Sequence, residues 1–169
     1  MSPFFFILMQ LAIVAYALVG GVFLAFSDFI MRSLALTGGT GGVEAMQVIN
    51  REVFRWVFMA LFLGMAAVSL VVAGYGANNL THPAGALILI AGLVYLIGCL
   101  GVTVFFNVPM NEALAGMDLS QDATRAYWTD TYLPRWTFWN TVRTVACGVS
   151  AALLLFGLMW MTQAQAQRA

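Results

Sequence analysis

Four long apolar stretches alternate with polar connections along the chain. Divided at its charged positions, the sequence has apolar stretches at about residues 3–27, 56–76, 83–106 and 144–162. A helix rises about 1.5 Å per residue, so roughly 20 residues cross a hydrocarbon core of about 30 Å. The pattern therefore predicts four transmembrane helices in one domain over residues 1–169. The predicted fold class is an all-α integral membrane four-helix bundle.

Two of the connections also carry helical signals. The glycine-rich run at residues 38–42 predicts a flexible break after the first helix. In residues 43–54, apolar side chains recur at helical spacing with the polar ones mostly opposite them. We therefore expect a helical extension that begins outside the bilayer and runs into the second span. The third connection, residues 107–143, is expected to be partly helical.

Small residues recur every four positions in three of the spans. They are Ala17, Gly21 and Ala25 in the first span, Ala60 and Gly64 in the second, and Gly148 and Ala152 in the fourth. Small side chains allow the backbones of membrane helices to approach closely. This spacing predicts the faces along which the helices pack.

Composition agrees with a membrane location. The chain is 62% hydrophobic and 8% charged, whereas soluble domains are about a quarter charged. The lipid bilayer is therefore an expected partner, and a homo-oligomer stays open. The formal net charge is zero and there is no lysine, so the chain lacks the basic patch of a nucleic-acid-binding protein, and no nucleic-acid partner is expected.

The distribution of charge predicts an orientation. All seven acidic residues and every arginine except Arg168 fall within residues 28–55 and 107–143. The positive-inside rule, which counts Lys and Arg, assigns these charged loops to the cytoplasm. Both termini are then expected outside.

The first polar motif, NVPMNE, lies at residues 107–112. Pro109 has no N–H, so the Phe105 carbonyl loses its helical donor and the helix is predicted to kink or stop. Such a break is tolerated where protein or water surrounds it. Thr103, Asn107 and Asn111 share one side if the helix continues, because four residues make about one turn. The alternative is that the helix simply leaves the membrane here.

The second polar motif follows helical spacing near the fourth span. Trp136, Asn140, Arg143 and Cys147 recur at intervals of four, three and four residues, which puts them on one helix face. This face is predicted to point at a cavity. The alternative is an interfacial belt, with Tyr132, Trp136 and Trp139 at headgroup depth and with Arg135 and Arg143 reaching toward water. Both motifs flank the same connection, so the asparagines and Arg143 are expected to converge.

Few residues of the metal-binding types are present. Cys99 and Cys147 lie inside spans, where thiols usually act as small hydrophobic groups. His82 is the only histidine and lies in a turn at the opposite end, so a histidine-rich metal or haem site is excluded. No metal ligands and no cofactor are predicted.

Four sequence segments carry a resemblance to a known family. They are YALVGGVFLAF, MQVINREVF, NVPMNEAL and WTFWNTVR, and together they extend over nearly the whole chain. The chain resembles a bacterial family of small membrane proteins related to anthrone oxygenases. The resemblance implies an integral protein of the bacterial inner membrane.

The resemblance also implies an activity. Anthrone oxygenases use dioxygen to convert a methylene between aromatic rings into a quinone carbonyl, without a metal or organic cofactor. The implied substrate is a hydrophobic, acidic, anthrone- or phenol-like molecule, and its chemistry needs a base, oxyanion donors and a dry pocket. On this ground the residues expected in catalysis are Asn107, Asn111, Asn140, Arg143 and Glu112, with Asp28 as an alternative base. Those expected to bind substrate are Tyr132, Trp136, Asp28 and Thr103.

Two other functional classes fit the same residues. In a non-catalytic binding or accessory protein, the polar side chains would hold the helices together. A quinone- or lipid-handling protein would use the Trp and Arg face to hold a ring carbonyl or a headgroup. An enclosed cavity bounded by these side chains favours catalysis, whereas side chains occupied by backbone carbonyls favour a structural role.

Overall fold

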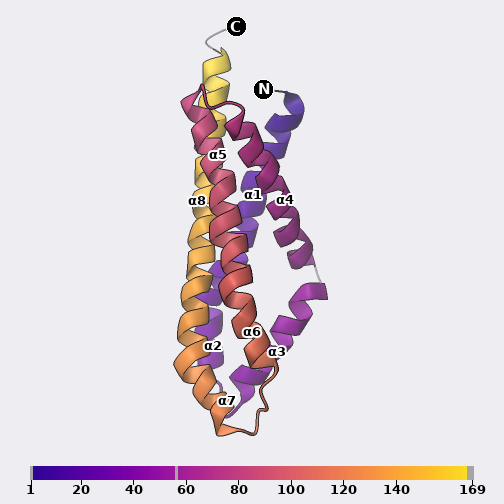
Figure 1. Cartoon of the computed structure of the whole chain (residues 1–169), viewed down its shortest axis with the longest axis vertical. Helices are drawn as coiled ribbons and strands as arrows, with labels where there is room; N and C mark the ends of the chain where they lie inside the picture. The colour runs from indigo at the N-terminus through magenta and orange to yellow at the C-terminus, as the bar shows by residue number, and fades with distance from the viewer. Residues whose placement is uncertain (1, 56, 167–169) are drawn as a thin grey trace.

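The computed structural model describes residues 2–55 and 57–166. Within these residues all regular structure is helical, and four long helical segments run side by side (Figure 1). The first segment comprises α1 (Pro3–Ala25), η1 (Phe26–Ile30) and α2 (Met31–Ala35). The second comprises α3 (Gly41–Glu52), η2 (Val53–Arg55) and α4 (Val57–Ala77). The third comprises α5 (Pro83–Tyr95), η3 (Leu96–Gly101), η4 (Thr103–Asn107) and α6 (Val108–Ala115). The fourth comprises α7 (Asp122–Ala126), η5 (Tyr127–Tyr132) and α8 (Leu133–Ala166).

Four helices are long and apolar enough to cross a bilayer, as the sequence predicts. They cover Pro3–Ala35, Val57–Ala77, Pro83–Ala115 and Asp122–Ala164. The fold class is confirmed: this is an all-α integral membrane protein with a helical extension, α3, before its second span. Trp56, where the second span was expected to begin, and Arg168 lie outside the described residues.

Three of the helices extend beyond the predicted spans at the charged end of the molecule. The first continues to Ala35 and the third to Ala115, and the fourth begins at Asp122. Most of the predicted third connection is therefore helix, and only residues 116–121 form a loop. In this loop the backbone N–H and the hydroxyl of Ser120 donate to the Asp118 carboxylate. These bonds hold the pKa of that carboxyl below its usual value.

The turn between α2 and α3 depends on glycine. Gly39 has a φ of 61°, a left-handed conformation that favours glycine over other residues. A Cβ at Gly42 would collide with the Leu34 carbonyl. The Thr37 hydroxyl donates to that same carbonyl at 2.6 Å. The glycine-rich run thus folds α3 back toward the membrane.

The third helix does not stop at Pro109, which was one of the two outcomes predicted there. The helix continues through the proline to Ala115 by way of the wide turns η3 and η4. Val108 donates its N–H to Thr103, five residues earlier. A pairing of this length is that of a π turn, and such turns occur often at functional sites.

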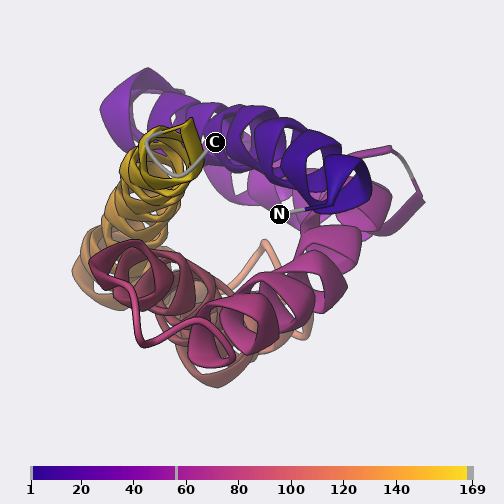
Figure 2. The same ribbon diagram turned by 90° about the horizontal axis from the view of Figure 1, so that it is seen from above.

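The four long segments form a ring in the order α1, α8, α5 and α4 when seen from above (Figure 2). Contacts are extensive between α1 and α8, between α8 and α5, and between α5 and α4, and are fewer between α1 and α4. Glycine permits a close approach of α5 to α4, because a Cβ at Gly92 would lie 2.5 Å from the Ser69 carbonyl oxygen.

The predicted small-residue faces are wrong. A Cβ at Gly21, Gly64 or Gly148 would meet nothing within 4 Å, and the alanines of the same rows are exposed or only half-buried. The close contacts come from neighbouring positions instead. Gly20 faces Cys147 on α8, and Gly98 faces Ala146.

Candidate functional site

A cavity of about 510 Å³ lies where α4 moves away from the third helical segment. Its walls come from α1, η1, α3, η2, α4, η3, η4, α6 and α8, and they are mostly aliphatic and aromatic. Its volume is within the range of small-molecule pockets. The polar side chains on its walls are Asn50, Glu52, Thr103, Asn111 and Arg143, together with the indole of Trp136.

Arg143 is the central polar group of this cavity. Its side chain belongs to α8 and only 5% of the residue is exposed. One terminal nitrogen donates to Asn140 Oδ1 at 2.6 Å and the other to Thr103 Oγ1 at 3.2 Å. The guanidinium carbon lies 4.2 Å from the centre of the Phe23 ring and 5.2 Å from that of Trp136. Oxygen acceptors and ring faces therefore hold the guanidinium in place.

Arg143 has no carboxylate partner among the residues that the structure describes. The ion pairs among the described residues are Arg55–Glu52 and Arg125–Asp122. The Nε atom of Arg143 is also buried without a hydrogen-bond partner. Burial of an unpaired charge is costly, and an arginine at membrane depth is a functional-site hypothesis by default. The site thus presents one uncompensated positive charge to an apolar cavity.

Asn111 belongs to a second polar group on the same wall. Its Oδ1 accepts from the Tyr132 hydroxyl at 2.7 Å and from Trp136 Nε1 at 2.8 Å. The Asn50 side chain donates to the same tyrosine oxygen at 3.2 Å. Because two donors fix the amide oxygen of Asn111, its NH₂ group is left to donate to a ligand. Tyr132 is fully buried and does not itself line the cavity.

Asn140 and Asn107 lie behind the wall. Asn140 donates to the Phe23 carbonyl and to Ser27 Oγ, both at 2.6 Å, and so ties α8 to the first segment. Asn107 donates to the Trp136 carbonyl at 3.2 Å, and its own Oδ1 is buried without a partner. Asn111 lines the cavity, whereas these two residues do not. Their contacts are those of side chains that position helices.

The expected bases are also misplaced. Asp28 and Glu112 are exposed, and neither lines the cavity. Glu52, at the end of α3, is the carboxylate on the cavity wall, and it pairs with Arg55 at 2.9 Å. Sequence reasoning missed Glu52 and Asn50, although both lie within the MQVINREVF segment.

The thiols of Cys99 and Cys147 lie 3.5 Å apart in the interior, and both are free. His82 precedes α5 at the other end of the molecule. Among the residues that the structure describes, no group of three or more His, Cys, Asp or Glu side chains is arranged to hold a metal ion.

The family model of anthrone oxygenase matches residues 51–153. The chain belongs to the anthrone oxygenase family. The match begins at the end of α3 and extends into α8, so it includes Glu52, Thr103, Asn111, Trp136 and Arg143. Neither a curated protein nor a solved structure matches the chain.

Proposed function

We propose that this anthrone oxygenase family member is a membrane oxygenase that binds an acidic, anthrone- or phenol-like aromatic molecule in the 510 Å³ cavity. Arg143 holds the oxygen of the deprotonated substrate. The observation that carries this proposal is the buried guanidinium, which lines the cavity, lacks a carboxylate partner and has an unpaired Nε. An oxyanion supplies both the missing charge and the missing acceptor.

The apolar walls strengthen this interaction. In a water-poor cavity, attraction between Arg143 and an oxyanion is screened less than in solution. The neutral aromatic acid gains little from the guanidinium, whereas its anion gains much. The site therefore favours the deprotonated form of a bound substrate. The Asn111 NH₂ group, fixed by Tyr132 and Trp136, is available to a second substrate oxygen.

The reaction that follows is balanced with dioxygen as the oxidant. A base removes one proton from the methylene group, and the resulting carbanion is stabilised as the enolate on Arg143. The electron pair of the carbanion forms a C–O bond to dioxygen, and protonation gives a hydroperoxide. Loss of the second methylene proton with cleavage of the O–O bond yields the carbonyl and one water molecule. We assign the proton transfers to Glu52, because it is the carboxylate on the cavity wall.

Reaction of anthrone with purified protein in lipid nanodiscs tests the proposal. Oxygen consumption and anthraquinone formation are measured after subtraction of the rate without protein. We expect Arg143→Gln to lose activity by about 10²-fold or more, as for removal of an oxyanion donor. Arg143→Lys should not restore it, because lysine lacks the planar fork.

The matched control is Arg135→Gln, an exposed arginine on the same helix that does not line the cavity. This variant should keep the wild-type rate. A folded Arg143→Gln protein that oxidises anthrone at the wild-type rate would contradict the proposal. Binding of anthrone without oxygen consumption by wild-type protein would favour a quinone- or lipid-handling protein.

A further inference from the structure

Exposed side chains among the lining residues mark where the cavity meets the molecular surface. The exposed residues of its lining are Val22 on α1, Phe54 in η2, Leu63 on α4 and Val104 in η4. The last two belong to α4 and to the third helical segment, and they mark an opening between these helices. Leu63 on α4 is 53% exposed and Val104 in η4 is 50% exposed. Both side chains are aliphatic, so the edges of the opening are apolar.

Two hydrogen bonds delimit this opening along the helices. At one end the Tyr95 hydroxyl of α5 donates to the Phe62 carbonyl of α4 at 2.9 Å. At the other end the Gln47 side chain of α3 donates to the Leu114 carbonyl of α6 at 2.8 Å. Between them, the described residues show no hydrogen bond from α4 to residues 96–113.

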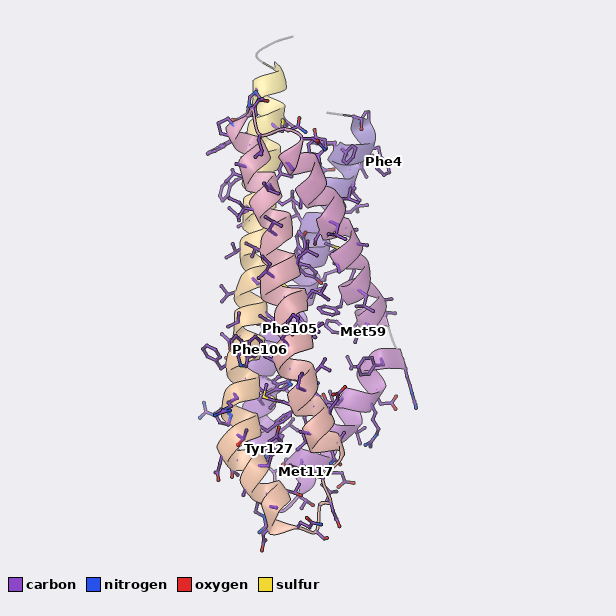
Figure 3. All side chains as sticks on the ribbon, in the orientation of Figure 1. Phe4, Met59, Phe105, Phe106, Met117 and Tyr127 are labelled. Atoms are coloured by element: carbon purple, nitrogen blue, oxygen red, sulfur yellow. The ribbon has the colours of Figure 1, made fainter. Side chains whose placement is uncertain are left out.

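The helices separate visibly over the same interval. α4 packs closely along α5, the first part of the third segment, and diverges from the rest of that segment toward α3 (Figure 1). Figure 3 places Met59, at the diverging end of α4, at about the height of Phe105 on the third segment. Met59 also lines the cavity.

The opening lies at the depth of the hydrocarbon layer. Leu63 and Val104 belong to the candidate membrane spans Val57–Ala77 and Pro83–Ala115. Leu63 follows Val57 by six residues, or about 9 Å of helix. The charged pair Glu52–Arg55 lies on the other side of Val57, toward the end where the predicted charged loops meet. We therefore expect lipid chains to surround the opening.

We propose that the aromatic ligand reaches the cavity from within the bilayer, through the opening between Leu63 and Val104. The identity of the ligand rests on the proposed function, whereas the route does not. A neutral aromatic acid partitions into the hydrocarbon layer, but its anion does so only at a high cost. The ligand therefore passes the opening in its protonated form and ionises beside Arg143. Its proton leaves toward Glu52, at the polar end of the cavity.

Narrowing the opening tests whether it is an entry route or only a binding contact, because a narrower route slows ligand association and dissociation alike. The probe is 2-naphthol, a phenol that is neutral at pH 7 and is not a substrate for methylene oxidation. It is added to proteoliposomes, and energy transfer from tryptophan is followed by stopped flow. In Val104→Phe, association and dissociation should both slow by about fivefold or more with little change in Kd, as expected of a gating element.

Ile97→Phe is the matched control, because Ile97 is 70% exposed on the same helical segment and does not line the cavity. Its rates should equal those of the wild type. Leu63→Phe tests the opposite edge and replaces Val104→Phe if that variant does not fold. Substitution by phenylalanine neither adds nor removes a tryptophan, so the number of energy donors stays the same.

The outcomes separate the route from the function. Unchanged rates in both edge variants, with binding lost in Arg143→Gln, would overturn the route and leave the proposed function intact. A change in Kd with an unchanged association rate would also overturn the route, because it indicates a binding contact. If wild-type protein does not bind 2-naphthol, both proposals fail.

Discussion

At the scale of single residues, the position of Arg143 depends on the length of its side chain. Asn140 and Arg143 lie three residues apart on α8, so they share one helix face. The short amide of Asn140 contacts the first segment, whereas the longer arginine extends past it into the cavity. Spacing alone places both residues on one face, and side-chain length decides which of them meets a ligand.

The second feature at this scale is the side-chain amide oxygen of Asn111. It accepts two hydrogen bonds, from Tyr132 and Trp136. We expect Asn111→Leu to destabilise the protein by about 1–3 kcal/mol for each buried donor left without an acceptor. Trp136→Phe in the same background should cost less than it does alone, because its bond is already lost.

Thermal unfolding of the two single variants and the double variant in detergent measures this coupling. Asn78→Ala provides the control, since Asn78 makes an exposed contact to the Gly74 carbonyl, and its melting temperature should change little. Strict additivity of Asn111→Leu and Trp136→Phe would show that the bond between these side chains contributes nothing measurable.

Part of the site was predictable from local spacing. The positions of Arg143, Trp136, Asn111 and Thr103 on the wall follow from two helical motifs. Glu52 could not be assigned, because its place depends on how α3 folds back against α6. A hydrogen bond between residues 67 positions apart, Gln47 to Leu114, fixes that arrangement.

At the scale of helical elements, apolar length predicts the spans and says little about which faces pack. All four spans are apolar around most of their circumference, so small-residue periodicity was the remaining signal, and it selected the wrong faces. Gly21, Gly64 and Gly148 have open space around them. The wide turns of the third segment were likewise unpredictable from Pro109 alone, since proline is compatible with a stop, a kink or a continued helix.

Two glycines test this reading of the packing. A Cβ at Gly92 would lie 2.5 Å from the Ser69 carbonyl oxygen and 2.8 Å from the Ala73 nitrogen, both backbone atoms of α4. Because backbone atoms cannot move aside cheaply, Gly92→Ala should destabilise the protein by about 1–3 kcal/mol.

Gly148→Ala is the control for that variant, because it introduces the same methyl group into open space on α8. Its helix propensity gain should leave stability unchanged or raise it by up to about 1 kcal/mol. Unfolding in graded denaturant compares the two variants in one detergent. Equal stability of Gly92→Ala and Gly148→Ala would mean that α4 and α5 do not approach as closely as the structure shows.

At the scale of the whole molecule, the polar groups are arranged along the long axis. Both described chain ends lie at one end, and the charged residues of α2, α3, α6 and α7 lie toward the other (Figure 1). The cavity lies between an apolar cluster around Tyr16 and Tyr95 and a second cluster around Met46 and Trp128. A neutral ligand in the bilayer and a proton at the charged end therefore reach the same cavity from different directions.

This arrangement makes the orientation in the membrane testable. Six arginines lie in residues 28–55 and 107–143, so the positive-inside rule puts this end in the cytoplasm. We expect Thr40→Cys to be shielded from a membrane-impermeant thiol reagent in intact cells, and His82→Cys to be labelled. The two native cysteines are buried, and the unmodified chain serves as the background control.

Permeabilised cells should then label both positions, which shows that each introduced thiol is accessible. One span, Val57–Ala77, separates position 40 from position 82, so the two positions should lie on opposite sides of the membrane. Labelling of both from outside in intact cells would contradict this. Labelling of Thr40→Cys alone would keep the four spans and invert the protein. In that orientation Glu52 would lie toward the side opposite the cytoplasm, so the result decides from which side of the membrane the base of the proposed reaction exchanges protons with water.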